Sequence, residues 1–361
     1  MSDEKVARLR LLDKLRKAGS IKSTKLTDSS LFTDKDMVPT MVPMVNVALS
    51  GKLDGGITRG LTVLAGPSKH FKTAFGLLMM KAYMDKYPES VVLFYDSEFG
   101  TPRGYFSSLK IDTDRVLHIP IKNIEELKFD LVKQLEELNV EDKVFVMIDS
   151  IGNLASKKEL DDARDEKSVA DMTRAKQLKS LFRMITPYLT LRDVPLIAVN
   201  HTYETQEMFS KQVVSGGTGI MYSSDNVWII GRRQQKKGTE LEGYDFIINV
   251  EKSRFVKEKS KIPISVTWEG GIRKYSGLLE VALEGGFIIK PSMGWYQKLD
   301  IETGEELEGK YRAAETETKD FWQPILDHKK FQKYVEGKYA LGDGLLTGIE
   351  LADKLEMEAD E

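Results

Sequence analysis

One stretch of the sequence has the residue types and spacing of a phosphate-binding loop. It reads Gly66-Pro67-Ser68-Lys69-His70-Phe71-Lys72-Thr73, between the apolar run Leu61–Ala65 and an apolar helical stretch. A strand, a tight loop and a helix amino terminus in this order aim backbone amides at an anion. In such a loop Lys72 reaches the β- and γ-phosphates of a nucleotide, and the Thr73 hydroxyl holds Mg²⁺. We therefore predict that this loop binds a nucleoside triphosphate together with its metal ion.

The loop departs from the usual pattern at one position. Phe71 stands where a glycine ordinarily precedes the lysine. Glycine adopts positive φ at no steric cost, whereas phenylalanine does so only with strain. The alternative for this segment is an ordinary strand-to-helix turn with a surface lysine.

Two carboxylates follow other predicted strands. Asp149 ends the apolar run Val144–Ile148, and Glu98 lies just beyond Val91–Tyr95. A carboxylate that ends a strand beside a phosphate loop holds Mg²⁺, directly or through water. A glutamate just beyond a central strand orients a water molecule for in-line attack on the γ-phosphate. We predict Asp149 as a metal ligand and Glu98 as the water-activating residue; the plainer alternatives are a helix cap and a solvated carboxylate.

A histidine follows a further predicted strand. The apolar run Leu196–Val199 is followed by Asn200 and His201. In a doubly wound sheet the carboxyl ends of the central strands meet at the crevice that binds the ligand. We therefore predict that His201 senses the γ-phosphate and passes its presence to the following loop. A lone histidine is more often structural, but polar groups at four strand ends in this order favour a nucleotide site.

The elements that position these residues alternate along the chain. Short apolar strands separated by helices predict a mostly parallel sheet covered on both faces, and the shorter links between the later strands predict an antiparallel edge. The predicted strands are Leu61–Ala65, Val91–Tyr95, Val144–Ile148, Leu196–Val199, Val227–Ile230 and Phe246–Val250, and the helices Thr73–Lys86, Ile124–Leu138 and Ser168–Tyr188.

The ends of the chain differ from this central α/β region. Residues 1–38 are predicted to form a helix over 3–18 and an oligomerisation arm, in which Lys25-Leu26-Thr27 and Leu31-Phe32 supply a short strand. We assign residues 39–287 to the core, 288–345 to a small C-terminal α/β subdomain and 346–361 to an acidic tail.

Composition limits the class of protein. The 361 residues suffice for one α/β domain with smaller attached parts. Cysteine is absent, which excludes disulfides and thiolate metal sites and is typical of a reducing cytoplasm. No apolar run approaches the roughly 20 residues that span a bilayer, and the first helix is too charged for a secretory signal. We therefore expect a cytoplasmic protein without a membrane partner.

The net charge of −3 conceals an uneven distribution. The segment 232–261 is strongly basic, whereas residues 350–361 hold six acidic side chains against Lys354 alone. Such a chain binds phosphate backbones locally and repels them at its end. Two interpretations of the acidic end stay open, competition with nucleic acid for the basic surface and simple solubilisation.

The strand-end residues together resemble the RecA family. The resemblance rests on the phosphate loop, on Glu98 after Tyr95-Asp96, on Asp149-Ser150, and on Asn200-His201 before a Gly-rich loop. The chain is more similar still to the UvsX recombination proteins of T-even-like phages, in the segments 93–100, 152–159, 200–211 and 250–254. This similarity covers about residues 23–340, and UvsX proteins share the phenylalanine found here at Phe71.

The resemblance implies a function and further site residues. It implies a helical filament on single-stranded DNA, with ATP held between neighbouring subunits and hydrolysed to drive homologous pairing and strand exchange. It implies that Glu98 activates water and that His201 replaces the more usual glutamine sensor. It also implies that Lys252 and Arg254 reach the ATP of the next subunit as an arginine finger does, and that Tyr105 packs on adenine.

Two segments fall where RecA-like proteins place DNA-binding loops, at about 156–168 and 202–217. Flexible glycines, a cation and aromatic or apolar wedges suit a loop that orders around stretched single-stranded DNA. Lysines and backbone amides contact phosphates there without reading sequence. The plainer alternative for both segments is an ordinary surface loop. The candidate DNA-binding residues are Lys157, Lys158, Thr202, Tyr203, Phe209, Lys211, Gly216 and Gly217.

We therefore expect an ATP-dependent homologous recombinase with a RecA-like α/β core, which uses ATP and Mg²⁺. Its expected partners are single-stranded DNA, homologous duplex DNA, further copies of itself, and single-strand-binding and loading or mediator proteins; a phage-encoded protein would act in the host cytoplasm. One alternative is a hexameric RecA-fold helicase, against which the N-terminal arm and the Gly-rich loop argue. The other is a recombinase paralogue acting as a scaffold, against which the set Lys72, Thr73, Glu98 and Asp149 argues.

Overall fold

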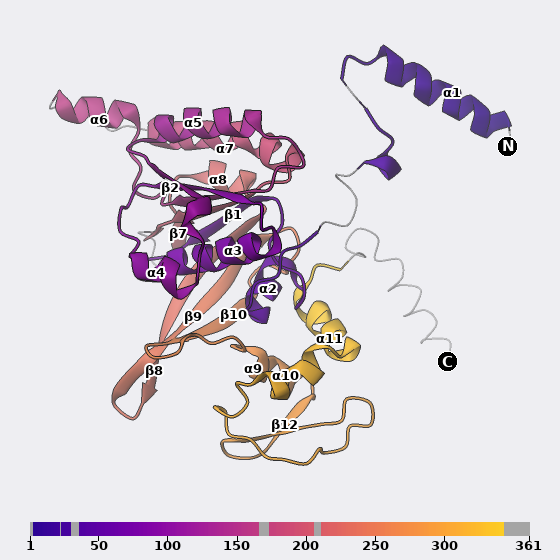
Figure 1. The fold of residues 1–361 in the computed structure, drawn as a ribbon, viewed down its shortest axis with the longest axis vertical. Helices are drawn as coiled ribbons and strands as arrows, with labels where there is room; N and C mark the ends of the chain where they lie inside the picture. Colours follow the sequence, from indigo (N-terminus) through magenta and orange to yellow (C-terminus); the bar gives the residue numbers. More distant parts are fainter. Residues whose placement is uncertain (1–2, 22, 30–35, 166–172, 206–210, 343–361) are drawn as a thin grey trace. The chain divides into compact units, whose positions relative to one another are not determined.

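The computed structural model describes residues 3–21, 23–29, 36–165, 173–205 and 211–342 (Figure 1). The chain divides into two compact units, residues 1–36 and 37–361. None of the described helices is long and apolar enough to cross a membrane.

The first unit contains the predicted helix but not the predicted strand. Helix α1 spans Asp3–Ala18 and ends before Gly19, as the pattern predicts. The segment Leu26–Asp28, predicted as part of a strand, is instead a 3-10 helix in which Asp28 N donates to Lys25 O and Ser29 N to Leu26 O. A strand needs a partner for its backbone, and a tight turn satisfies these groups locally. The pair Leu31-Phe32 lies outside the described residues.

The second unit is built on one sheet, whose nine strands within the described residues follow the order β11-β10-β9-β8-β1-β5-β4-β2-β3. The strands from β8 to β3 pair in parallel and those from β8 to β11 antiparallel, which confirms the predicted mixed topology. Their bounds are β1 Gly60–Ala65, β2 Val91–Asp96, β3 Val116–Pro120, β4 Val144–Asp149, β5 Pro195–Asn200, β8 Asn226–Lys237, β9 Glu240–Ser253, β10 Lys261–Thr267 and β11 Gly271–Ile272.

The burial of each strand follows its place in the sheet. Strands β1, β4 and β5 are buried along their whole length, as expected of strands covered on both faces. Edge strand β3 is mostly exposed and was not predicted, because its short sequence, which includes His118 and Pro120, has no apolar run. The alternation of strand and helix therefore identifies the centre of the sheet better than its edge.

Helices cover both faces of the sheet (Figure 1). Helices α2 (Pro43–Ser50) and α3 (Lys72–Lys86) pack on one face, and α5 (Ile124–Glu137) and α7 (Thr173–Leu191) on the other. Asn123 caps α5, since its side chain accepts a hydrogen bond from Glu126 N. The two faces have separate apolar cores, so that the sheet is held from both sides and its strand ends have fixed positions.

Short elements surround the carboxyl ends of the central strands. They include a hairpin of β6 and β7 within the segment predicted as the second DNA-binding loop, and a helix, α6, within the first. The bounds at these ends are α4 Arg103–Ser108, α6 Lys157–Arg164, β6 Thr202–Glu204 and β7 Gln212–Val214. A 3-10 helix, Thr113–Arg115, and α8, Thr218–Ser223, instead precede the amino ends of β3 and β8.

The C-terminal elements pack on the antiparallel side of the sheet. They are α9 Leu278–Glu284, β12 Ile288–Ser292, β13 Trp295–Lys298, α10 Lys319–Leu326 and α11 Lys329–Tyr339. Trp322 and Phe331 are buried in the same apolar core as Trp228 of β8. The boundary at residue 288 between core and subdomain stays a prediction, and the predicted acidic tail lies outside the described residues.

Candidate active site

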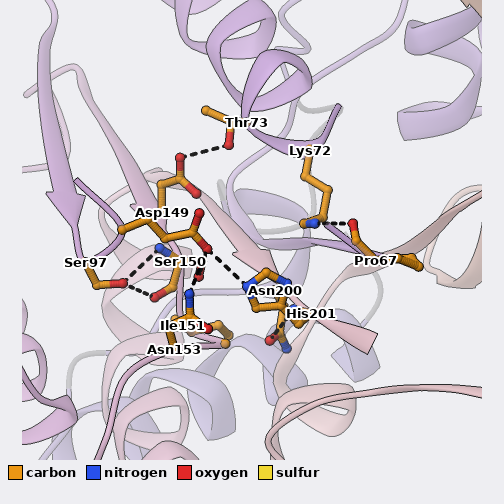
Figure 2. Close-up of polar contacts among 12 residues, drawn as sticks. Pro67, Lys72, Thr73, Ser97, Asp149, Ser150, Ile151, Asn153, Asn200 and His201 are labelled. Atoms are coloured by element: carbon orange, nitrogen blue, oxygen red, sulfur yellow. Dashed lines mark hydrogen bonds and ion pairs between the residues drawn. The ribbon is translucent and has the colours of Figure 1, made fainter. Parts of the chain in front are cut away.

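The predicted phosphate loop connects β1 to α3. Gly66 has φ 156°, and a Cβ there would lie 2.9 Å from the Ile230 carbonyl oxygen. Lys72 is buried, and its Nζ donates to Gly66 O at 3.0 Å and Pro67 O at 2.7 Å (Figure 2). Burial lowers the pKa of Lys72, while the charges of Glu98 and Asp149 act in the opposite direction. The lysine therefore lies folded against its own loop, where phosphate oxygens can replace the two carbonyls.

Phe71, the unusual residue of this loop, has the left-handed backbone that the pattern ordinarily gives to glycine. Its φ is 61° and its ψ 16°. The ring stacks on Phe246, with 4.9 Å between ring centroids, and meets Phe75 edge-on at 5.6 Å. A left-handed L-residue costs about 1–2 kcal/mol, and an aromatic pair contributes about 0.5–1.5 kcal/mol beyond its buried area. Ring packing thus offsets the backbone strain that the substitution introduces.

Asp149, at the end of β4, lies directly beside the first turn of α3. Its Oδ2 accepts a hydrogen bond from Thr73 Oγ1 at 2.9 Å (Figure 2). It accepts a second from Thr101 Oγ1 at 3.3 Å. Its Oδ1 is buried and has no hydrogen-bond partner among the residues that the structure describes. Burial raises the pKa of Asp149 to about 6, against the lowering effect of the Thr73 hydroxyl. A buried carboxylate with an unpaired oxygen is an incomplete site that suits a cation.

Glu98 receives hydrogen bonds from three side chains on two other strand ends. Its Oε1 lies 2.7 Å from Ser150 Oγ, 3.2 Å from Asn153 Nδ2 and 3.1 Å from His201 Nε2. Ser97 also joins the end of β2 to the end of β4, because its Oγ donates to Ser150 O and accepts from Ser150 N (Figure 2). The sequence prediction gave no role to Ser150 or Asn153. The structure brings the predicted residues Glu98 and His201 into contact.

The turn that carries Glu98 is held by Asp96, which the sequence prediction did not include. Asp96 Oδ1 accepts hydrogen bonds from the amides of Glu98 at 3.0 Å and Phe99 at 2.8 Å. Its Oδ2 lies 3.1 Å from His118 Nε2 of β3. Asp96 is 5% exposed, so that its carboxylate and these hydrogen bonds are shielded from solvent. An Asp two residues before the glutamate is the one sequence signal for this turn.

His201 connects the site to the β6–β7 hairpin. His201 O accepts a hydrogen bond from Ser215 N at 2.9 Å, and Asn200 Nδ2 donates to Ser215 O at 2.8 Å. The His201 ring packs closely on Gly152, where a Cβ would lie 2.3 Å from ring atom Cδ2. Asn200 and His201, which lead into β6, are therefore bonded to Ser215, which directly follows β7.

A cleft of about 620 Å³ joins these groups to an aromatic region. Predicted residue Tyr105 lines it from α4; Arg232 of β8, Tyr244 of β9 and Trp268, just after β10, line it too. The Arg232 guanidinium lies 4.6 Å from the centre of the Tyr244 ring, and Trp268 meets Tyr244 edge-on. These three residues were not predicted, because they lie in parts of the chain remote from the loop motif. Such a surface suits a planar ring beside the phosphate site. The cleft is also lined by Ser68, Lys69 and His70.

Lys252 and Arg254 do not join this cleft. Arg254 pairs with Asp225, and Asp225 in turn accepts a hydrogen bond from Leu61 N at the amino end of β1. Lys252 Nζ donates to Met221 O at 2.6 Å. The phosphate loop lies at the other end of β1, roughly 16 Å away at about 3.3 Å per residue. Both cations are thus too remote for a nucleotide bound by the same chain.

The candidate DNA-binding residues lie in two segments of the chain, α6 and the β6–β7 hairpin with the residues that follow it. Lys157 and Lys158 begin α6, and Lys158 pairs with Asp162 on the same helix. Thr202 and Tyr203 belong to β6, with Tyr203 54% exposed. The remaining candidates are Lys211 before β7, Gly216 and Gly217 with φ of 98° and 78°, and Phe209, which lies outside the described residues.

Comparison with known proteins identifies relatives along most of the chain. The "Recombination and repair protein" of Enterobacteria phage T4 is 52% identical over 356 residues, which cover 97% of this chain and 90% of the relative. "Protein RecA" of Streptomyces rimosus is 28% identical over 72% of this chain and 68% of its own length, and that of Kineococcus radiotolerans 25% over 72% and 73%. The family model "Bacteriophage T4, Recombination and repair protein, C-terminal domain" matches residues 275–335.

Proposed function

This chain belongs to the family of the phage T4 recombination and repair protein, within the RecA family of homologous recombinases, and we propose that it couples ATP hydrolysis to strand exchange on single-stranded DNA. Membership of the RecA family implies binding of ATP and of DNA. The assignment of residues to ATP hydrolysis, to DNA contact and to contact between subunits is part of this proposal.

We assign the activation of water to Glu98. Its carboxylate lies at the cleft that also contains Lys72 and Asp149, and three hydrogen-bond donors fix its position. A carboxylate held in this way accepts a proton from a water molecule aligned with the γ-phosphate. Lys72 leaves the two loop carbonyls and stabilises the charge that develops on the phosphate oxygens. This position of Glu98 is the observation that carries the proposal.

The site fits Mg²⁺ bound together with ATP. The Thr73 hydroxyl and the unpaired Oδ1 of buried Asp149 supply two oxygens beside the phosphate loop. The described residues contain no group of three His, Cys, Asp or Glu side chains that could hold a metal by themselves. Mg²⁺ is typically held by one or two protein oxygens, with phosphates and water completing its shell. When bound, the ion neutralises phosphate charge as it develops.

The remaining parts of the cleft and the distal cations have separate roles in this proposal. Tyr105 packs on adenine from one side, and the opposite surface of Arg232 and Tyr244 provides a second aromatic and cationic contact. Lys252 and Arg254 reach the ATP of a neighbouring subunit, because they lie at the far end of β1 from their own loop. Such a heterologous contact repeats from copy to copy and generates a helical filament.

We propose that His201 couples the nucleotide to DNA. The γ-phosphate attracts His201 away from Glu98 and shifts the hairpin of β6 and β7, whose ends are bonded to Asn200 and His201. Tyr203, Phe209, Lys211 and the glycine pair then bind single-stranded DNA, with Lys157 and Lys158 of the first segment beside them. Base pairing with homologous duplex DNA reads the sequence, and single-strand-binding and mediator proteins control loading.

Joint-molecule formation tests the proposed function. A labelled single strand is mixed with homologous supercoiled duplex, Mg²⁺ and ATP, and product is measured with matched heterologous duplex as the control. We expect product that requires both ATP and homology. Tight DNA binding without joint molecules would contradict strand exchange. In that case ATP turnover together with rings by electron microscopy would favour a helicase, and DNA binding without ATP turnover would favour a scaffold.

A further inference from the structure

The turn after β4 presents three of its residues to the catalytic side chains. Ser150 and Asn153 donate to the Glu98 carboxylate, and Gly152 packs against the His201 ring. The turn is itself tied to β5, because Ile151 N donates to Val199 O at 2.9 Å. Its conformation therefore determines where Glu98 and His201 lie relative to one another.

A single guanidinium holds this turn from the other side. Arg174 of α7 donates from Nε to Leu154 O at 2.8 Å and from Nη2 to Ile151 O at 3.0 Å and Gly152 O at 2.8 Å. Within the described chain no carboxylate forms an ion pair with Arg174, so its charge is directed at backbone carbonyls. A fork of fixed N–H groups bonded to three carbonyls of one turn defines that turn's shape.

The same guanidinium also reaches the base of the β6–β7 hairpin. Its Nη1 lies 3.5 Å from Ser215 Oγ, and Ser215 is the residue whose backbone bonds to Asn200 and His201. The next residue, Gly216, rests on α7, where a Cβ would lie 2.8 Å from Leu178 Cδ1. Arg174 thus touches the turn that leads into the first proposed DNA segment and the end of the second.

We propose that Arg174 is a positioning residue that couples the nucleotide site to both DNA-binding segments. Arg174 does not line the nucleotide cleft. It makes the Glu98–His201 geometry depend on the position of the hairpin, and it makes the position of the hairpin depend on the nucleotide. DNA bound at the hairpin fixes the position of Ser215, and through Arg174 it fixes the turn that presents Asn153 and Gly152. The inference rests on the proposed function, because it assumes that DNA binds the hairpin.

The variant Arg174→Lys tests this proposal on the full-length protein. Lysine keeps the charge but has one nitrogen, which cannot span four acceptors. Anisotropy of a labelled oligo-dT gives the dissociation constant of the DNA with a non-hydrolysable ATP analogue and with ADP. The constant with ADP divided by the constant with the analogue measures the coupling. We expect this ratio to fall about fivefold or more. DNA-stimulated kcat should fall with it, whereas KM for ATP should stay within about twofold because the phosphate loop is untouched.

Two further variants separate positioning from loss of structure. Arg192→Lys, just beyond the other end of α7, is the matched control and should leave the ratio unchanged. Ser215→Ala removes only the hairpin-side contact and should lower the ratio less than Arg174→Lys does. The double variant should be no worse than Arg174→Lys, since both changes interrupt one connection.

Several results would overturn the inference. One is an unchanged ratio in Arg174→Lys, and another is an increase in KM for ATP as large as the loss in kcat. A third is a double variant whose ratio falls by the product of the two single effects. If thermal melting shows that Arg174→Lys is unfolded, Ser215→Ala carries the test alone, and an unchanged ratio there decides against coupling. Equal DNA affinity with both nucleotides in the wild type would instead contradict the proposed function, so that the two failures are distinguishable.

Discussion

The Glu98 carboxylate and the His201 imidazole lie 3.1 Å apart, although 103 residues separate them in the chain. Parallel strands β2 and β5 end on the same side of the sheet, on either side of β4, and bring the two side chains together. Each is also tied to the turn after β4, Glu98 through Ser150 and His201 through its contact with Gly152. The residue to which we assign the activation of water and the proposed phosphate sensor thus share one hydrogen bond.

Replacing Glu98 with glutamine should abolish hydrolysis while sparing ATP binding. Glutamine keeps the shape and an acceptor oxygen but cannot take a proton from water. We expect DNA-stimulated kcat to fall by about 10²–10⁴, with little change in the affinity for a fluorescent ATP analogue. The control is Glu137→Gln, an exposed change near the end of α5. Substantial turnover in Glu98→Gln would assign the activation of water to another group.

Replacing His201 with alanine should separate DNA affinity from the nucleotide state. The side chain that faces Glu98 is lost, while the backbone bonds between residue 201 and Ser215 remain. We expect wild-type protein to bind oligo-dT more tightly with an ATP analogue than with ADP, and the variant to bind equally with both. Anisotropy titrations measure this difference. A variant that still discriminates between the nucleotides would exclude His201 as the sensor.

The raised pKa of Asp149 makes a prediction about stability and pH. The pKa is about 6 in the folded protein against an ordinary value of 3.8. The folded state therefore holds this proton more tightly than the unfolded state does. The contribution of Asp149 to the free energy of unfolding is fully present below pH 3.8 and is lost as the pH rises through 6. The difference of about 2 pKa units corresponds to on the order of 3 kcal/mol.

Asp149→Asn should accordingly stabilise the nucleotide-free protein at pH 8 and have little effect near pH 4, while removing Mg²⁺-dependent ATP binding. Urea melts of both proteins at the two pH values provide the comparison, and Asp54→Asn, an exposed change, serves as the control. A stability difference that is the same at both pH values would show that Asp149 does not titrate as described.

The left-handed backbone of Phe71 predicts an order of stability among substitutions. Phe71→Gly loses the ring contacts to Phe75 and Phe246 but removes the strain, whereas Phe71→Ala loses the contacts and keeps the strain. We expect the alanine variant to be less stable than the glycine variant by about 1 kcal/mol, and both to be less stable than the wild type. Denaturant midpoints measure the order. Equal stability of the two variants would place residue 71 outside the left-handed region.

The position of Arg254 predicts that defective subunits complement one another. Lys72→Ala removes the phosphate contact on the face of the subunit that binds ATP. Arg254→Gln removes the cation on the opposite face, which reaches the ATP of the neighbouring subunit. Each variant alone should therefore lack DNA-stimulated hydrolysis. In an equal mixture that assembles head to tail at random, about a quarter of the interfaces combine two intact faces. We expect a corresponding share of wild-type activity. A mixture as inactive as its components would contradict action in trans.

Much of the site could be predicted because its signals are local. The loop Gly66–Thr73, the carboxylates Asp149 and Glu98, and His201 all follow apolar runs directly, and the ends of buried parallel strands meet at one edge. The predicted central strands and helices agree with the structure to within a few residues at most ends. The same reasoning failed for Leu26–Asp28, where backbone groups satisfied locally replace a strand.

Contacts that depend on the order of the strands were decided only by the tertiary structure. Ser150 and Asn153 hold Glu98 because β4 lies beside β2, and no periodicity specifies that order. Tyr105, Tyr244 and Trp268 line one cleft, whose walls come from distant parts of the chain. Arg174 bonds to a turn 20 residues before it and a hairpin 41 residues after it. Sequence patterns specify which groups are available, whereas burial of both sheet faces determines which of them meet.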